Sequence, residues 1–194
     1  MVTVIAARHA QDPRIHELLD GLGRHSRDVL SHGVHVATLS IRVAHVLGLD
    51  DIRIARLARA ALLHDLGKQH VPVEILEKPG RLTAAEWEIV ERHPTTGHRM
   101  LVDDGLPVEA RIVLHHHERV DGGGYPTGRA GEGIPLEARI LAVADSFDAM
   151  TSMRPYRSAM TVDAAVAELR AGAGSQWDAG CVEAIASFAV RTAA

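Results

Sequence analysis

Histidine and aspartate residues recur about once per helix length through the middle of this chain, and they constrain its fold more than any other feature. The set comprises His64-Asp65, His93, His116-His117 and Asp145, with His35 further upstream. Iron, manganese and zinc bind imidazole and carboxylate ligands of this kind. When each helix of a bundle carries one or two of them, all of them can point to one place in its interior. The spacing therefore predicts a helical bundle with a metal site in its interior.

Start and stop signals predict helices along the whole chain and no convincing strand. Asp12-Pro13 and Thr83-Ala84-Ala85-Glu86 are typical helix starts, and we expect Pro94 to end the helix that carries His93. The expected helices cover residues 13–22, 27–47, 51–66, 84–93, 107–117 and a segment from 135 through 145, followed by two more capped by Thr161 and Asp178. The predicted fold class is all-α, with residues 1–24 as a helical lead-in to one domain over residues 25–194.

Apolar spacing predicts which faces of two helices are buried. On the helix that carries His35, the expected buried stripe is Leu30, Val34, Ala37, Ile41 and Ala44. On the next helix, the expected buried residues are Ile54, Leu57, Ala58, Ala61 and Leu62, and the expected solvent-facing ones are Arg53, Arg56 and Arg59.

Composition favours a soluble domain of the cytoplasm. The chain is 46% hydrophobic and 24% charged, and its single cysteine, Cys181, cannot form an internal disulfide. We find no secretory leader and no apolar stretch near the roughly 18 residues that cross a bilayer. The net charge is −4 with scattered basic residues, so a nucleic-acid polymer is not an expected partner. An anionic ligand would have to be held locally, by metals and a few cations.

The candidate ligands are suited to hydrolysis of a phosphate ester. Adjacent residues on a helix diverge by about 100°, so Asp65 can bridge two cations while His64 binds one. Two such cations share a water that becomes a hydroxide near neutral pH and attacks phosphorus. Lys68 follows on the same helical face as His64 and is expected to meet a phosphate, while Arg154 and Arg157 are candidates for a second phosphate clamp. We assign the catalytic roles to Asp65 and Lys68.

Each candidate also has an ordinary structural interpretation. A histidine on a helix is more often a surface or hydrogen-bonded residue than a ligand, and both arginines are also compatible with a solvated loop. His115 fits the last turn of a helix better than a metal site. We therefore assign no ligand role to His9, His16, His25, His45, His70, His98 or His115. Asp145 stands out because it lies in an apolar run, where an unpaired carboxylate would be costly.

Six short motifs follow one another in order along the chain. They are His64-Asp65-Leu66-Gly67-Lys68, Ile75-Leu76-Glu77-Lys78-Pro79-Gly80, His116-His117-Glu118, Asp121-Gly122-Gly123-Gly124-Tyr125-Pro126, Ile134-Pro135, and Val143-Ala144-Asp145 through Arg154-Pro155-Tyr156. Together they resemble the HD-GYP domain, a branch of the HD-domain phosphohydrolases, over about residues 25 to 190. The resemblance implies an HD-domain-like helical bundle and a bacterial phosphodiesterase that opens cyclic di-GMP to pGpG or GMP at an iron- or manganese-type two-metal site.

The resemblance also implies roles for single residues. One metal would be held by His35, His64, Asp65 and Asp145, and Asp65 would bridge to a second metal held by His93, His116 and His117. Lys68, Arg154 and Arg157 would contact phosphates of the substrate. Gly124-Tyr125-Pro126 would form a loop on the side of the substrate, or on the side of a partner, because HD-GYP domains are thought to dock diguanylate cyclase domains.

Departures from the family pattern bear on the number of metals. Members with three metals carry a glutamate one turn before the first histidine, whereas Ser31 stands four residues before His35 here. We therefore expect two metals, with His32 as an alternative ligand. Val120 replaces the aromatic residue that often precedes the Asp-Gly of the loop.

Two other functions remain open from the sequence. The first is an HD-domain phosphohydrolase that acts on another nucleotide or another cyclic dinucleotide. The second is a catalytically silent module that senses a nucleotide or binds a cyclase. The chain carries no sensory or receiver segment that we recognise, so we expect its regulation to come from an upstream sensory protein, from metal or redox state, or from expression.

Overall fold

The computed structural model describes residues 13–153 and 158–189, apart from the side chains of residues 27 and 28. In chain order its elements are α2 (Pro13–His25), α3 (Arg27–Val46), α4 (Asp51–Leu63), the 3-10 helix η1 (Leu66–His70), α5 (Val73–Leu76), α6 (Ala84–Val90), α7 (His93–Asp103), α8 (Pro107–Leu114), the 3-10 helix η2 (Gly131–Gly133), α9 (Leu136–Thr151), α10 (Val162–Ala171) and α11 (Ala179–Ala189). Within these ranges there is no β-strand, so the all-α prediction is confirmed.

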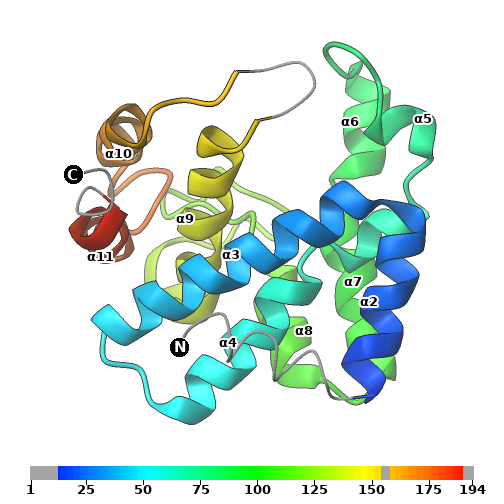
Figure 1. Ribbon diagram of the computed structural model, residues 1–194, viewed down its shortest axis with the longest axis horizontal. Helices are drawn as coiled ribbons and strands as arrows, with labels where there is room; N and C mark the ends of the chain where they lie inside the picture. Colours follow the sequence, from blue (N-terminus) through cyan, green and yellow to red (C-terminus); the bar gives the residue numbers. More distant parts are fainter. Residues whose placement is uncertain (1–12, 154–157, 190–194) are drawn as a thin grey trace.

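Helix α3 crosses the middle of the molecule (Figure 1). It packs against α4 and α9, with α10 and α11 beyond α9 on one side and α2, α7 and α8 on the other. Gly33 permits the close approach of α3 to α4, because a Cβ there would lie 3.1 Å from the carbonyl oxygen of Leu62. One hydrophobic core runs through these helices, and it includes Ile15 and Leu19 of α2. The division of the chain near residue 25 stays a prediction.

The buried face of α3 is rotated relative to the expected stripe. Ala37, Ile41 and Ala44 are buried as predicted, but Val34 is 37% exposed, and Val36 and Val43 are buried instead. Apolar residues occupy most phases of this helix, so apolar spacing alone left its orientation open. Packing against α4, α9 and α11 decides the orientation, and this rotation also decides which histidine of α3 faces the interior.

Several local predictions are confirmed, and two are wrong. Thr83 and Glu86 form a complete capping box at α6, and the Thr161 side chain caps α10. Pro94 does not end a helix; it lies in the first turn of α7, where the missing N–H of proline costs nothing. Arg59 is not a free surface charge, because its guanidinium donates to the buried carboxylate of Glu109 on α8.

The described helices include none that is long and apolar enough to cross a membrane.

The segment after α4 lies unusually close to α7. A Cβ on Gly67 would be 2.0 Å from the carbonyl oxygen of His93 and 2.8 Å from the amide nitrogen of Gly97. Both contacts are to backbone atoms, so no side chain can rotate away. Gly67 therefore allows η1, which carries Lys68 and follows Asp65, to lie directly against the start of α7.

We expect Gly67→Ala to lower the free energy of unfolding by about 1–3 kcal/mol, because the new methyl group overpacks two backbone segments. Gly133→Ala is the matched control, since a Cβ at Gly133 meets no atom within 4 Å. Urea denaturation of the metal-free proteins measures both values. Equal stability of the two variants would contradict the close packing of η1 on α7.

Candidate metal centre

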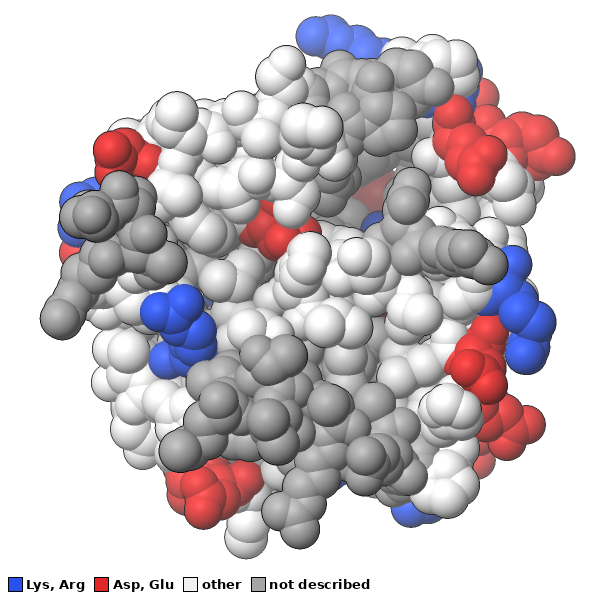
Figure 2. Space-filling view, in the orientation of Figure 1, with Lys and Arg blue, Asp and Glu red and all other residues white. Residues whose placement is uncertain are grey.

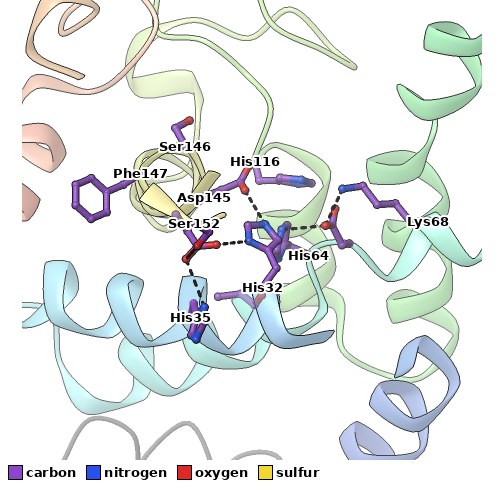
Figure 3. Close-up of polar contacts among 12 residues, drawn as sticks. His32, His35, His64, Lys68, His116, Asp145, Ser146, Phe147 and Ser152 are labelled. Carbon is purple, nitrogen blue, oxygen red and sulfur yellow. Dashed lines mark hydrogen bonds and ion pairs between the residues drawn. The ribbon is translucent and has the colours of Figure 1, made fainter. Parts of the chain in front are cut away.

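The ends of several helices converge on one buried group of histidines and carboxylates. His64 and Asp65 follow α4, His93 begins α7, and His116 and His117 lie in the turn after α8. His64, His93 and His116 are each 1% exposed and Asp65 is 2% exposed. Figure 3 shows the side chains of His32 and His64 close to Asp145 of α9, with Lys68 on the other side of His64. The structure thus brings together every described ligand candidate except His35.

Two clusters within this group have the composition of metal sites. Ligand atoms of His93, His116 and His117 all lie within 4.8 Å of one another, and so do those of His32, His64 and Asp65. Asp65 connects the two clusters: its Oδ1 is 3.5 Å from Nε2 of His93, and its Oδ2 is 3.4 Å from Nε2 of His64. A carboxylate in this position can reach an ion in each cluster.

Helix ends determine which nitrogen of each imidazole faces the cluster. Nδ1 of His64, His93 and His116 hydrogen-bonds the backbone carbonyl three residues earlier, namely that of Ala61 at 2.8 Å, Val90 at 2.7 Å and Val113 at 2.6 Å. A carbonyl only accepts, so the proton is on Nδ1 and the lone pair of Nε2 points inward. These carbonyls lie in the last turns of α4, α6 and α8, where a carbonyl group has no hydrogen-bond donor within its own helix.

Among the described residues, the inward atoms have no satisfactory hydrogen-bond partner. Nε2 of His93 and Nε2 of His116 face each other at 3.3 Å, and two lone pairs at this distance repel. Protonation of one ring, which would relieve the repulsion, is unfavourable. Burial lowers the pKa of His93 to about 3 and holds the pKa of His116 well below its ordinary value. Oδ1 of Asp65 is also buried without a hydrogen bond. The donor set therefore fits divalent cations.

Lys68 links this centre to the surface. Its Nζ donates to Oδ2 of Asp65 at 2.7 Å, and its side chain is 23% exposed. Burial alone would raise the pKa of Asp65, but the charges around it, including the Lys68 ammonium, outweigh burial and hold this pKa well below its usual value. Figure 2 shows a hollow on one face of the molecule, with acidic and basic atoms visible inside it.

The structure places His32, and not His35, in the cluster. Nε2 of His32 lies 2.9 Å from Oδ1 of Asp145, and its side chain is 15% exposed. The His35 side chain is 62% exposed on the outer side of α3, although its Nδ1 lies 3.6 Å from Oδ1 of Asp148. The rotation of α3 explains this correction, because His32 borders the buried face and His35 lies nearly opposite it. Burial alone would lower the pKa of His32, but its hydrogen bonds with Asp145 and Asp148 outweigh burial and raise it to about 9.

Asp148 is a residue that the sequence analysis did not single out. Its Oδ2 accepts from Nδ1 of His32 at 2.6 Å, and its Oδ1 accepts from the hydroxyl of Ser152 at 3.0 Å. This leaves Nε2 of His32 to face Asp145. The available signal was the spacing of Asp145 and Asp148, because residues three apart share a helix face.

The Gly124-Tyr125-Pro126 loop lies against the metal centre. The Tyr125 ring stacks on the His117 ring with centroids 4.9 Å apart, and the Tyr125 amide donates to the carbonyl of His117 at 3.2 Å. Gly124 has no space for a side chain, since a Cβ would lie 2.5 Å from that same carbonyl oxygen. Burial raises the pKa of the Tyr125 hydroxyl. Arg154 and Arg157, the predicted phosphate clamp, lie outside the described residues.

We expect Asp148→Asn to weaken metal binding by roughly 10- to 100-fold, the usual effect of removing the carboxylate that orients a ligating histidine. Asp163→Asn, an exposed change on α10, is the matched control. Competition with a chelator of known affinity measures both constants. Unchanged affinity in Asp148→Asn would remove the orienting role of Asp148.

Comparison with known proteins agrees with this geometry. A family model described as "HD domain" matches residues 15–180. The "Cyclic di-GMP phosphodiesterase response regulator RpfG" of Xanthomonas campestris pv. campestris is 49% identical over 154 residues, which is 78% of this chain and 40% of that protein. The "3'3'-cGAMP-specific phosphodiesterase 3" of Vibrio cholerae is 40% identical over 155 residues, 79% of this chain and 34% of that protein. The chain thus spans less than half the length of either relative.

A solved structure shares the fold. The structure of "Bd1817, a HDG"Y"P protein from Bdellovibrio bacteriovorus" superposes with a TM-score of 0.69 and 23% identity, covering 82% of this chain and 52% of the other. At this identity the likeness supports the fold alone. The family match, the relatives and the ordered motifs around the buried histidines lead to the same conclusion: this chain belongs to the HD-domain family, in its HD-GYP branch.

Proposed function

We propose that this protein is a metal-dependent phosphodiesterase that hydrolyses cyclic di-GMP to pGpG, GMP or both. The observation that carries the proposal is the pair of ligand clusters joined by the Asp65 carboxylate. The names of the relatives supply the substrate class, since RpfG is named as a cyclic di-GMP phosphodiesterase. Cleavage of an anionic phosphodiester also requires buried groups that can hold metal ions and a nearby cation that a substrate can reach, and Lys68 is such a cation.

The proposed cofactor is a pair of divalent ions, iron or manganese. His93, His116 and His117 would hold one, and His32, His64 and Asp145 would hold the other, with Asp65 shared between them. When bound, such ions activate water and polarise the phosphate. With His32 in the cluster, the residue one turn earlier on α3 is Asp28 and not Ser31. The carboxylate position of the three-metal members is therefore filled in the sequence, and the metal count is measured on Asp28→Asn as well as on the natural protein.

The protein's own groups would position the substrate around these ions. In the structure, the ammonium of Lys68 is held by Asp65 beside the clusters, where a phosphate would sit. We propose Lys68 and Asp65 as the catalytic residues, with Arg154 and Arg157 as further phosphate contacts. Gly124, Tyr125 and Pro126 would line the substrate side, because the Tyr125 ring covers His117.

The preferred cyclic dinucleotide has two candidates. The Vibrio cholerae relative at 40% identity is named for 3'3'-cGAMP, so this nucleotide is the alternative substrate that a specific observation favours. A catalytically silent module that senses a nucleotide or binds a cyclase is a further alternative. We also propose a cytoplasmic location and a regulatory partner, either a diguanylate cyclase domain or an upstream sensory protein.

Metal counting and product analysis test the function together. In protein purified without oxygen, we expect two ions per chain in Asp28→Asn and at least two in the natural protein. We expect the natural protein to cleave cyclic di-GMP faster than 3'3'-cGAMP. Asp65→Asn should lose metal and turnover together while its helical circular dichroism stays unchanged, because its role is coordination. Asp103→Asn, an exposed change on α7, is the control. Absence of cleavage of both nucleotides by the metal-loaded protein would leave the silent module as the better account.

Lys68→Ala separates substrate handling from metal binding. We expect it to retain both ions and to lower kcat/KM by about 10- to 1000-fold, on the order of 1.4–4 kcal/mol of transition-state stabilisation. Lys78→Ala is the control, since Lys78 pairs with Glu86 on α6, away from the cluster. Loss of metal from Lys68→Ala with normal turnover per bound ion would show that Lys68 supports the ligands and not the substrate.

A further inference from the structure

Glu118 is a buried carboxylate directly after the ligand pair His116-His117, and neither the metal centre nor the proposed chemistry uses it. Its side chain is fully buried. A carboxylate in such a position is costly unless several donors satisfy it. Its donors show what it holds.

All the strong partners of Glu118 lie on the far side of the Gly124-Tyr125-Pro126 loop. Oε1 accepts from the amide of Thr127 at 2.7 Å and from its hydroxyl at 2.6 Å. Oε2 accepts from the amide of Arg129 at 3.1 Å. The neighbouring His115 Nδ1 is 3.6 Å from Oε1 and makes no hydrogen bond. Glu118 therefore binds loop backbone and a loop hydroxyl, and it makes no contact with the ligand atoms.

The near side of the same loop is held by the adjacent residue. The Tyr125 amide donates to the carbonyl of His117, and Gly124 packs against that carbonyl without room for a Cβ. Residues 117 and 118 thus hold the loop before and after Pro126. Between these two attachments, the Tyr125 ring lies stacked on the His117 imidazole.

The base of the loop has separate attachments. The Gly131 amide donates to the carbonyl of Val120 at 2.9 Å, and the Asp121 amide donates to the carbonyl of Ser175 at 2.8 Å. These bonds do not involve Glu118. Loss of the Glu118 contacts would therefore free the loop after Pro126 while its base stays in place. Tyr125, at the tip of the loop, would then be held only from its near side, by the bond of its amide to His117.

We propose that Glu118 is a positioning residue that fixes the loop tip and thereby keeps Tyr125 stacked on His117 at the substrate side of the metal centre. It touches neither metal nor substrate. Its effect on turnover rests on the proposed function, but its effect on the position of Tyr125 does not.

The test follows Tyr125 directly. The chain has two tyrosines, so fluorotyrosine labelling of a Tyr156→Phe background leaves Tyr125 as the only reporter in fluorine NMR. Three variants are compared in zinc-loaded protein. Glu118→Gln keeps the shape of the side chain but replaces one accepting oxygen with an NH2 group, and Thr127→Val removes the hydroxyl donor. Glu132→Gln is an exposed control in η2. A soluble gadolinium chelate reports the exposure of the ring.

In Glu118→Gln we expect the Tyr125 resonance to move toward that of free fluorotyrosine and its broadening by the chelate to increase several-fold, with zinc content unchanged. Thr127→Val should shift in the same direction by less, and Glu132→Gln should match the parent protein. With cyclic di-GMP, kcat/KM of Glu118→Gln should fall by roughly 10- to 100-fold, mainly through KM, because misplacement of a positioning group by about 1 Å has effects of this size.

Two results would overturn the proposal. One is an unchanged Tyr125 resonance and exposure in Glu118→Gln and Thr127→Val. The other is loss of zinc from Glu118→Gln in proportion to lost activity, because Glu118 would then support the ligands. If Glu118→Gln does not fold, Thr127→Val decides by the same NMR measurement. If the natural protein cleaves neither cyclic dinucleotide, the proposed function fails while the NMR result still judges Glu118.

Discussion

The structure depends on a concentration of buried acceptor atoms that have no hydrogen-bond donor among the described residues. Nε2 of three histidines and one oxygen of Asp65 point into the same small region, and burial keeps His93 and His116 from accepting protons there. Such a group is unfavourable unless something positive satisfies it. The Lys68 ammonium reaches only the other oxygen of Asp65. The ends of α4, α6 and α8, the close contact of Gly67 with α7 and the Tyr125 ring on His117 all lie around this group.

Much of the architecture could be predicted from local signals. Caps and glycines act over three or four residues, so the capping box at Thr83 and the cap at Thr161 were readable from the sequence. Pro94 was misread because proline is compatible both with a helix stop and with a first turn. Arg59 was misread because its partner, Glu109, lies 50 residues away on another helix. Local patterns carry no information about such a pairing.

The sequence could predict which histidines and carboxylates gather at the candidate centre, except where their placement depends on the rotation of α3. His64, Asp65, His93, His116 and His117 lie next to helix ends, where a stop signal also fixes the position of the residue. His32 and His35 lie inside a helix with apolar residues at most phases, so only the packing of α3 against α4, α9 and α11 distinguishes them. Glu118 and Asp148 escaped notice for a similar reason: each acts through a neighbour, and a sequence motif does not state which neighbour.

The carbonyls that bind Nδ1 of His64, His93 and His116 belong to the helix turns immediately before these residues. Ring orientation and proton position at these three ligands are therefore local properties, established as α4, α6 and α8 form. Any ions that this centre binds would therefore meet rings that are already oriented, and ordering these side chains would not reduce the affinity for metal. His32 is the exception. Its partners, Asp145 and Asp148, lie on α9, so the orientation of the His32 ring depends on the packing of α3 against α9.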